Sequence, residues 1–150
     1  MLVRCLYASR LGKSHSPKLL NDILETSRNH NTKHGITGVL VATGESFIQV
    51  LEGGRAHVSE TYNLIAQDKR HNDVTLLSFE EISQRSFEGW SMGEVNVSQM
   101  NPAVLLKHSA TLHIDPFAMS AAAVLSLLKD LVASGTVVCG NATRGRGSKV

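Results

Sequence analysis

The sequence predicts an α+β fold, in which a ferredoxin-like βαββαββ sheet carries two helices on one face and C-terminal helices on the other. Two observations support this prediction. Strand-length apolar runs and amphipathic segments follow one another in the order strand, helix, hairpin, helix, strand, strand. After Asn101-Pro102, a further segment carries an apolar helical stripe too strong to remain in water, and the uncovered face of the sheet would bury it.

The first half of the chain is expected to form a strand, a helix and a hairpin. Residues 2–8 are apolar on both sides except for Arg4, which is typical of a buried strand. Ser16-Pro17 opens a helix, with serine as the N-cap and proline as the first helical residue. This helix is expected to fray at residues 29–31, because asparagine and histidine favour caps and turns over helix interiors. Two hairpin strands follow around a tight turn, at residues 36–42 and 47–52.

The second half supplies the remaining helices and strands. Gly53-Gly54 breaks the chain before a helix and two strands, which are expected at residues 56–67, 73–82 and 90–97. Ser120 as N-cap and Gly135 as a stop delimit the apolar C-terminal helix. This helix and the shorter one before it are expected at residues 121–133 and 103–109. The expected organisation is a core at residues 1–98, a helical extension at 99–135 and a disordered tail at 136–150.

Composition and charge narrow the class of protein. A chain of 150 residues, 42% of them hydrophobic, is long enough for one domain with a real core. A net charge of +2 gives no reason to expect a nucleic-acid or membrane partner, and the basic tail has no interleaved aromatic residues. The N-terminus lacks a signal-peptide pattern, and no stretch is long enough to cross a bilayer. Two distant cysteines fit a reducing compartment, so we expect a cytoplasmic protein.

Enzyme and metal signatures are missing from the sequence. It contains no GxGxxG or GK[ST] phosphate loop, no HExxH and no CxxC. His30 and His34 would lie one helical turn apart only if the first helix continued past Asn31, and Gly35 predicts that it does not. The adjacent Glu80-Glu81 pair faces opposite sides of a strand. We therefore expect neither a metal site nor a catalytic carboxylate pair.

Two polar side chains are expected inside the core. Strand alternation places Gln49 on the same face as Phe47 and Leu51, and Tyr7 on the interior face of the first strand. An unpaired interior amide costs about 1–3 kcal/mol, so both groups need a polar counterpart. Either they bond each other and stabilise the core, or they face a bound polar ligand. Asn31 has the same two interpretations, as a C-terminal helix cap or as a binding residue.

Six sequence blocks occur in order along the first 97 residues: YAS at 7–9, SRNHN at 27–31, GITGVL at 35–40, FIQVLEG at 47–53, IAQDKRH at 65–71 and FEGWSM at 87–92. Together they resemble the BLUF family of blue-light sensors, which hold a flavin. Residues 106–109 and the helix after them are similar to the C-terminal extension of short, stand-alone members without an attached enzyme domain. The resemblance therefore implies a photoreceptor rather than an enzyme.

The resemblance implies a flavin, FAD or else FMN, between the two core helices. Ile23 and Ile65 would clamp its ring, and Asn31 would bond its pyrimidine edge. The other residues expected to bind or position the flavin are Tyr7, Ser27, His30, Phe47, Gln49, Asp68, Arg70 and His71. Many members carry a basic residue or histidine just before the helix-two isoleucine, where this chain has Leu64. The phosphates would instead meet one of the nearby cations, Lys33, Lys69 or Arg28.

The resemblance also implies a photocycle. Tyr7 would donate an electron and a proton to the excited flavin, and Gln49 would relay the proton and end with its amide rotated or tautomerised. The altered hydrogen bond moves flavin absorption to the red. Trp90 and Met92 on the last strand would pass the change to the C-terminal helices and a downstream signalling protein, unless they serve only core packing. We expect a homo-oligomer. The alternatives are a dark-acting flavin oxidoreductase and a ferredoxin-like module for another ligand.

Overall fold

The computed structural model describes residues 1–12, 16–95, 97, 100–135 and 137–138. Its strands are β1 (Leu2–Arg10), β2 (Thr37–Ala42), β3 (Ser46–Gly54), β4 (Asn72–Ile82), β5 (Gly93–Val95) and β6 (Val137–Val138). Its helices are α1 (Pro17–His34), α2 (Arg55–Gln67), α3 (Pro102–His108) and α4 (Ala121–Ala133). Every helix and strand predicted from the sequence is present, and β6 is an addition.

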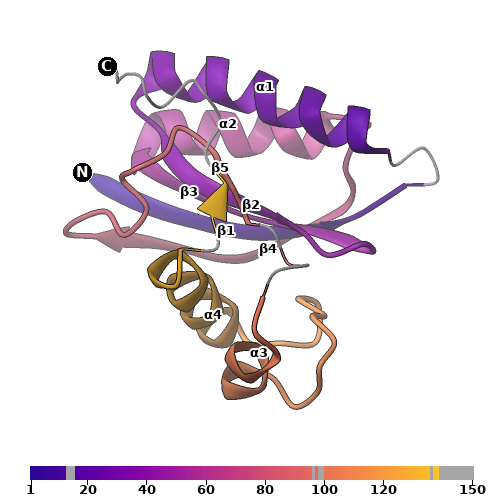
Figure 1. The fold of residues 1–150 in the computed structure, drawn as a ribbon. Coiled ribbons are helices and arrows are strands. Elements are labelled where there is room, and N and C mark those ends of the chain that lie inside the picture. The colour runs from indigo at the N-terminus through magenta and orange to yellow at the C-terminus, as the bar shows by residue number, and fades with distance from the viewer. Residues whose placement is uncertain (13–15, 96, 98–99, 136, 139–150) are drawn as a thin grey trace.

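The strands form one mixed sheet in the order β4-β1-β3-β2-β5-β6 (Figure 1). β3 lies between β1 and β2 and is antiparallel to both, while β4 is antiparallel to β1. α1 therefore links two parallel strands across an inserted third strand, which is the split βαβ arrangement of a ferredoxin-like fold. β5 joins the sheet parallel to β2. The predicted fold class is confirmed.

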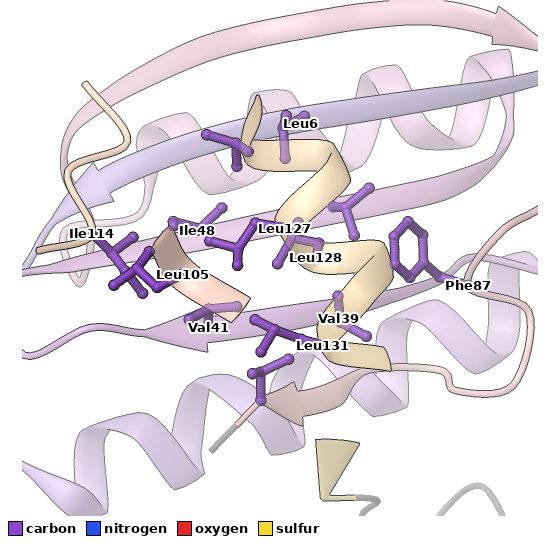
Figure 2. Close-up of a cluster of buried hydrophobic side chains, with 13 residues drawn as sticks. Leu6, Val39, Val41, Ile48, Phe87, Leu105, Ile114, Leu127, Leu128 and Leu131 are labelled. Atoms are coloured by element: carbon purple, nitrogen blue, oxygen red, sulfur yellow. The ribbon is translucent and has the colours of Figure 1, made fainter. Parts of the chain in front are cut away.

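Alternating side chains give each face of the sheet its own core. α1 and α2 cover one face, and α3 and α4 cover the other (Figure 1). We call the buried residues beneath α1 and α2 the helix-face cluster: Val3, Cys5, Tyr7, Ile23, Leu24, Ile36, Leu40, Phe47, Leu51, Val58 and Met92. The far-face cluster, drawn in Figure 2, is Leu6, Val39, Val41, Ile48, Val50, Phe87, Val95, Leu105, Ile114, Val124, Leu127, Leu128 and Leu131. The two clusters share strands but no residue.

α1 is longer than the sequence predicts. The expected fraying at residues 29–31 is wrong, because the helix continues to His34 and ends at Gly35 in the left-handed conformation (φ 67°). The Gly35 N–H donates to the Asn31 carbonyl and closes the last turn. Asn31 is only 1% exposed, so tertiary burial offsets its low helix propensity. The predicted start is confirmed, since Ser16 caps the first turn through its side chain.

The last core strand is shorter than expected. A strand is predicted over residues 90–97, but β5 is only Gly93–Val95, so Trp90 and Met92 lie in the irregular segment before it. The Trp90 carbonyl accepts from the Gly38 N–H (3.0 Å), which fixes this segment against β2 instead of extending the strand. At Gly38 the backbones approach so closely that a Cβ would collide with the Val50 carbonyl. Glycine is therefore required at this position.

The predicted tail contains a short strand. Disorder is predicted from residue 136, whereas Val137–Val138 form β6 and pair with β5. Val137 packs against the far-face cluster, which explains why the chain stays on the sheet here. Residue 136 and residues 139–150, with the basic part of the tail, lie outside the described residues.

Charged side chains attach the two C-terminal helices to each other, and attach the connection between them to the sheet. Asp130 of α4 accepts hydrogen bonds from Lys107 (3.0 Å) and His108 (2.6 Å) at the end of α3. Arg10, the last residue of β1, lies 4.0 Å above the centroid of the Phe117 ring. Among the described residues, no helix has the length and apolar character needed to cross a membrane.

Candidate functional site

A pocket lies between α1 and α2, against β3. Its empty space measures about 540 Å³, a volume that includes open solvent at the pocket's mouth. Its thirteen lining residues are Ile23, Thr26, Ser27, His30, Asn31, Gln49, Leu51, Thr61, Leu64, Ile65, Asp68, Arg70 and His71. Nine of them belong to the set predicted from the sequence. Of the predicted binding residues, Tyr7 and Phe47 are buried beside the pocket rather than in its lining.

Four lining residues were not predicted, namely Thr26, Leu51, Thr61 and Leu64. The helical ones could have been found from spacing. Thr26 follows Ile23 by three residues and Thr61 precedes Ile65 by four, so each shares a helix face with a predicted wall residue. Leu64 is 58% exposed and offers no side-chain hydrogen-bond donor.

Tyr7 and Gln49 lie opposite each other on β1 and β3, at the inner side of the pocket. Both are buried, with exposed fractions of 0% and 1%. Gln49 Nε2 donates to Met92 Sδ (3.4 Å), while the Tyr7 hydroxyl has no hydrogen-bond partner among the described residues. The interpretation that the two side chains satisfy each other is therefore wrong. A buried hydroxyl without a partner costs about 1–3 kcal/mol.

The environment of Tyr7 also fixes its protonation state. Burial raises the pKa of the Tyr7 hydroxyl well above its usual value, and the nearby Cys5 adds to the effect. The phenol is therefore neutral and keeps its proton at physiological pH. The Tyr62 ring meets the Tyr7 ring edge-on, with centroids 5.6 Å apart. A neutral, apolar-walled phenol with a free hydroxyl is suited to donating a hydrogen bond or a proton to a ligand in the pocket.

Asn31 connects the pocket to the segment before β5. It is not a side-chain cap, because Gly35 ends the helix; instead, Asn31 Nδ2 donates to the Ser91 carbonyl (2.7 Å). Arg28 Nε donates to the Met92 carbonyl (2.9 Å) from the preceding turn of α1. The Gly38 N–H donates to the Trp90 carbonyl, so the backbone carbonyls of three successive residues, 90 to 92, each accept a hydrogen bond. The backbone that carries Met92 is thus fixed to α1 and β2.

Asp68, Arg70 and His71 follow α2 and form the polar end of the pocket. The Asp68 carboxylate accepts from Arg70 Nη2 (2.6 Å) and from the Arg70 backbone N–H (2.9 Å). The side-chain hydrogen bonds from Arg70 lower the pKa of the Asp68 carboxyl, so this pair is ionised. His71 Nδ1 lies 3.0 Å from Ser9 Oγ, and its ring lies 5.4 Å from that of Phe47.

His30 and His34 stack at the other end of the pocket, with ring centroids 4.3 Å apart, because α1 continues through both. His30 Nε2 lies 2.8 Å from Thr61 Oγ1, and the Thr61 hydroxyl donates to the His57 carbonyl. Since that proton is committed, His30 Nε2 must be the donor to Thr61. Burial lowers the pKa of His30 and His34 adds to the effect, which favours the neutral ring. Among the described residues, no three potential ligands are grouped to hold a metal.

Trp90 and Met92 lie on opposite faces of the sheet. Met92 is fully buried in the helix-face cluster, while Trp90 is partly buried against the far-face cluster. Trp90 does not line the pocket, whereas Ser27 does. Neither Lys33 nor Lys69 lines it. Met92 is thus the predicted relay residue in direct contact with Gln49.

The buried His71 imidazole predicts a pH-dependent stability. Burial lowers the pKa of His71 in the folded protein below the value of about 6.5 in the unfolded chain. The unfolded state therefore takes up the proton first, so the free energy of unfolding falls as the pH drops below about 6.5. We expect Tm to fall by about 3–5 °C per pH unit between pH 6.5 and the folded-state pKa, measured by circular dichroism.

The matched variants are His71→Gln and His113→Gln. The first should reduce this pH dependence, while the second removes a histidine whose side chain is 58% exposed and should leave it. The same Tm profile in His71→Gln as in the unsubstituted chain would contradict the assignment.

A family model described as BLUF, sensors of blue-light using FAD, matches residues 2–93. The chain belongs to the BLUF family. That match contains every strand and helix that builds the pocket, and all thirteen lining residues. Membership makes this part of the chain a sensory domain rather than a catalytic one.

Curated BLUF relatives are much longer proteins. The chain is 29% identical over 87 residues to the blue light- and temperature-regulated antirepressor BluF of Escherichia coli, covering 58% of this chain and 22% of that protein. It is 32% identical over 92 residues to the photoactivated adenylate cyclase subunit beta of Euglena gracilis, covering 61% of this chain and 11% of that protein. The chain thus spans about a fifth or less of these relatives.

Solved BLUF structures extend the likeness to the C-terminal helices. BlsA in its photo-activated state gives a TM-score of 0.76 at 31% identity, covering 88% of this chain and 95% of that one. The dark state of the BLUF protein BlrB gives 0.71 at 28% identity, covering 89% and 96%. Klebsiella pneumoniae BlrP1, solved with FMN and cyclic diGMP, gives 0.66 at 26% identity, covering 90% of this chain and 35% of that one.

Proposed function

We propose that this protein senses blue light through a flavin held between α1 and α2, and that it signals by rearranging the hydrogen bonds of Tyr7 and Gln49. The observation that carries the proposal is the buried Tyr7 hydroxyl, which has no hydrogen-bond partner in the described part of the chain and lies beside the pocket between the two helices. A flavin would supply that partner, since its ring presents nitrogen and carbonyl acceptors within an otherwise flat apolar surface. The residues present therefore fit the cofactor of the family.

The pocket offers a complementary group for each part of a flavin. Ile23 and Ile65, from the two helices, supply apolar walls for the ring. The groups available to its polar edge are Asn31, Gln49 and His30, with Ser27 beside them. The ionised Asp68–Arg70 pair and the neutral His71 also line the pocket and would meet the ribityl side.

We infer FAD as the flavin, because the description of the family model names it. The structure of BlrP1 contains FMN, so the shorter form is the alternative for this chain. The Nε of Arg28 already donates to the Met92 carbonyl, which makes Lys33 and Lys69 the better candidates for the phosphates.

When bound, the flavin supplies blue-light absorption and a strongly oxidising excited state. Tyr7 has a neutral phenol whose proton is not bound by any group of residues 1–12, 16–95, 97, 100–135 and 137–138, so it can release that proton with an electron and recover both. Gln49 is the adjacent amide, with a donor at one end and an acceptor at the other. Rotation or tautomerisation of this amide exchanges the two ends without consuming any group.

Rotation of the amide would break a specific contact. In the described state Gln49 Nε2 donates to Met92 Sδ, and an amide oxygen turned toward the sulfur cannot donate. Met92 would then lose its only hydrogen bond from Gln49, while its backbone stays tied to α1 through Arg28 and Asn31. Because β5 begins at the next residue and pairs with β6, we propose that the change passes through β5 toward α4.

The output of the sensor is proposed to be a protein contact. We propose that the core at residues 1–98 receives the light and that the helical extension at 99–135 contacts a downstream protein. Leu106 and Leu112, with exposed fractions of 52% and 62%, are apolar surface residues of that extension. Relatives carry out related tasks as an antirepressor and as cyclase subunits. We further propose a cytoplasmic homo-oligomer.

The proposal is tested by loading the protein with FAD or with FMN and recording absorption spectra before, during and after blue illumination. We expect a yellow protein whose spectrum shifts to the red and returns in the dark. Yellow protein that bleaches with a reducing substrate would indicate a flavin oxidoreductase instead. Protein that takes up neither flavin would contradict the proposal and favour a module for another ligand.

A further inference from the structure

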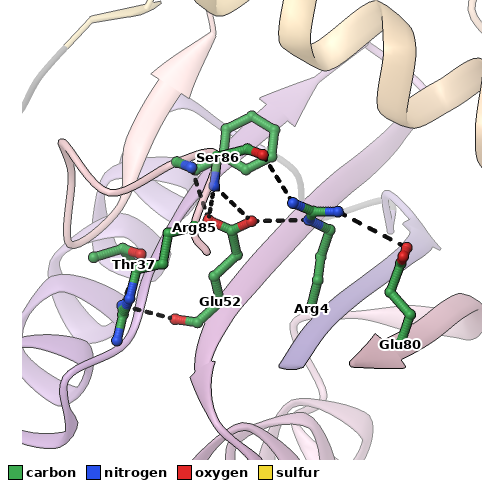
Figure 3. Close-up of polar contacts among 7 residues, drawn as sticks. Arg4, Thr37, Glu52, Glu80, Arg85 and Ser86 are labelled. Atoms are coloured by element: carbon green, nitrogen blue, oxygen red, sulfur yellow. Dashed lines mark hydrogen bonds and ion pairs between the residues drawn. The ribbon is translucent and has the colours of Figure 1, made fainter. Parts of the chain in front are cut away.

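Glu52 is a fully buried carboxylate on the face of β3 opposite to Gln49. It is 0% exposed and accepts hydrogen bonds from Arg4 Nε (2.8 Å), from the Ser86 N–H (2.9 Å) and from the Phe87 N–H (2.7 Å) (Figure 3). Arg4 is 5% exposed, and its Nη2 donates to Ser86 Oγ (2.8 Å). The buried charges are thus paired with each other and with backbone donors.

These bonds fix the connection between β4 and β5, residues 83–92. Arg85 reinforces the attachment, because its Nη1 donates both to Thr37 Oγ1 (2.9 Å) and to the Glu52 carbonyl (3.1 Å) (Figure 3). The connection is therefore tied to β1 through Arg4, to β2 through Thr37 and to β3 through Glu52. Residues 83–92, which form neither helix nor strand, are therefore held at three strands of the sheet.

The connection carries contacts to both sides of the sheet. Phe87, whose N–H is bound by Glu52, is fully buried in the far-face cluster with Leu127, Leu128 and Leu131 of α4 (Figure 2). Met92, five residues later, accepts the hydrogen bond from Gln49 in the helix-face cluster. One anchored segment thus reaches the pocket side through Met92 at its end and packs with the C-terminal helix through Phe87 in its middle.

We propose that the Glu52–Arg4 pair positions this connection so that a change at Met92 is transmitted to α4. The inference rests on the proposed function, since it adds the connection between β4 and β5 to the path of the same light signal. Without the hydrogen bonds of Glu52, the backbone of the connection could adjust when Met92 moves, and the movement would not reach α4. The pair touches neither Tyr7 nor Gln49, so it acts on transmission and on the lifetime of the altered state, not on the primary photochemistry.

The test compares three variants of the flavin-loaded full chain. Glu52→Gln removes the charge while keeping one acceptor, and Arg4→Met/Glu52→Gln removes both charges, so that no buried ion is left unpaired. Glu80→Gln is the matched control, because Glu80 lies 3.9 Å from Arg4 with a side chain that is 47% exposed. The readouts are the size of the red shift, the rate of dark recovery, and the light-minus-dark change in amide hydrogen exchange of α4.

We expect both Glu52 variants to keep the red shift, to recover in the dark about fivefold faster and to lose the light-dependent exchange change in α4; the factor corresponds to one lost hydrogen bond. The control should match the unsubstituted protein in all three. Unchanged recovery and exchange in the Glu52 variants, or failure of both to fold, would overturn the positioning role. Absence of any red shift in the unsubstituted protein would instead overturn the proposed function.

Discussion

A Tyr7→Phe variant is expected to bind flavin with no red shift under blue light. The substitution removes the hydroxyl that supplies the proton and keeps the buried ring in place. Because that hydroxyl has no partner among the described residues, its loss leaves no protein group unsatisfied. The cofactor-free variant should therefore be more stable than the unsubstituted chain, by about 1 kcal/mol. Difference spectra measure the first effect and thermal unfolding the second.

Tyr62→Phe is the matched control for this experiment. Tyr62 is the other tyrosine of the sequence, and its ring lies 5.6 Å from that of Tyr7. Its hydroxyl has no assigned role in the photocycle, so the control should shift to the red like the unsubstituted protein. A reversible red shift of normal size in Tyr7→Phe would refute the role of Tyr7.

Replacing Gln49 by leucine should also abolish the red shift while the flavin remains bound. Leucine fills a similar volume but has neither end of the amide, so no hydrogen bond can be exchanged. The hydrogen bond to Met92 Sδ is lost as well, and because the sulfur is a weak acceptor we expect a change in unfolding free energy of less than about 1 kcal/mol. Light-minus-dark spectra and the flavin content after purification measure the two outcomes.

The control for Gln49→Leu is Met92→Leu, which removes the sulfur and leaves the amide. It should keep the red shift, because Tyr7 and Gln49 are intact, and lose the light-dependent response of α4. A Gln49→Leu protein with a full photocycle would refute the role of Gln49. Loss of the red shift in Met92→Leu would show that the red shift depends on the Met92 thioether and not on the Gln49 amide alone.

The fold could be predicted because its main features are local in the sequence. Alternation on β3 correctly predicted that Gln49 is buried, and Ser16-Pro17 correctly predicted the start of α1. The end of α1 was missed because the left-handed Gly35 and the burial of Asn31 outweigh the poor helix propensity of residues 29–31. The length of β5 depends on the bond between Gly38 and Trp90, which is not visible in the pattern of residues 90–97.

The pocket could be predicted largely through the family resemblance, since spacing alone left Tyr7 and Gln49 open to mutual pairing. The Glu52 network could not be predicted. Its carboxylate is satisfied by the backbone of Ser86 and Phe87, which lie 34 and 35 residues away in the sequence. Every residue except proline has a backbone N–H, so the sequence does not reveal which of these groups will bind a carboxylate. In the sequence, a glutamate that is buried by such bonds cannot be distinguished from an exposed glutamate on a strand.

The separation of the two clusters has a consequence for how this protein can change in evolution. Residues of the helix-face cluster and of the far-face cluster alternate along the same strands, yet none belongs to both clusters. Substitutions beneath α3 and α4 can therefore accumulate without altering the walls of the pocket. Related proteins can therefore differ in the surface formed by α3 and α4 while keeping the same pocket between α1 and α2. The connection between β4 and β5 packs with both clusters, so its residues are constrained by both.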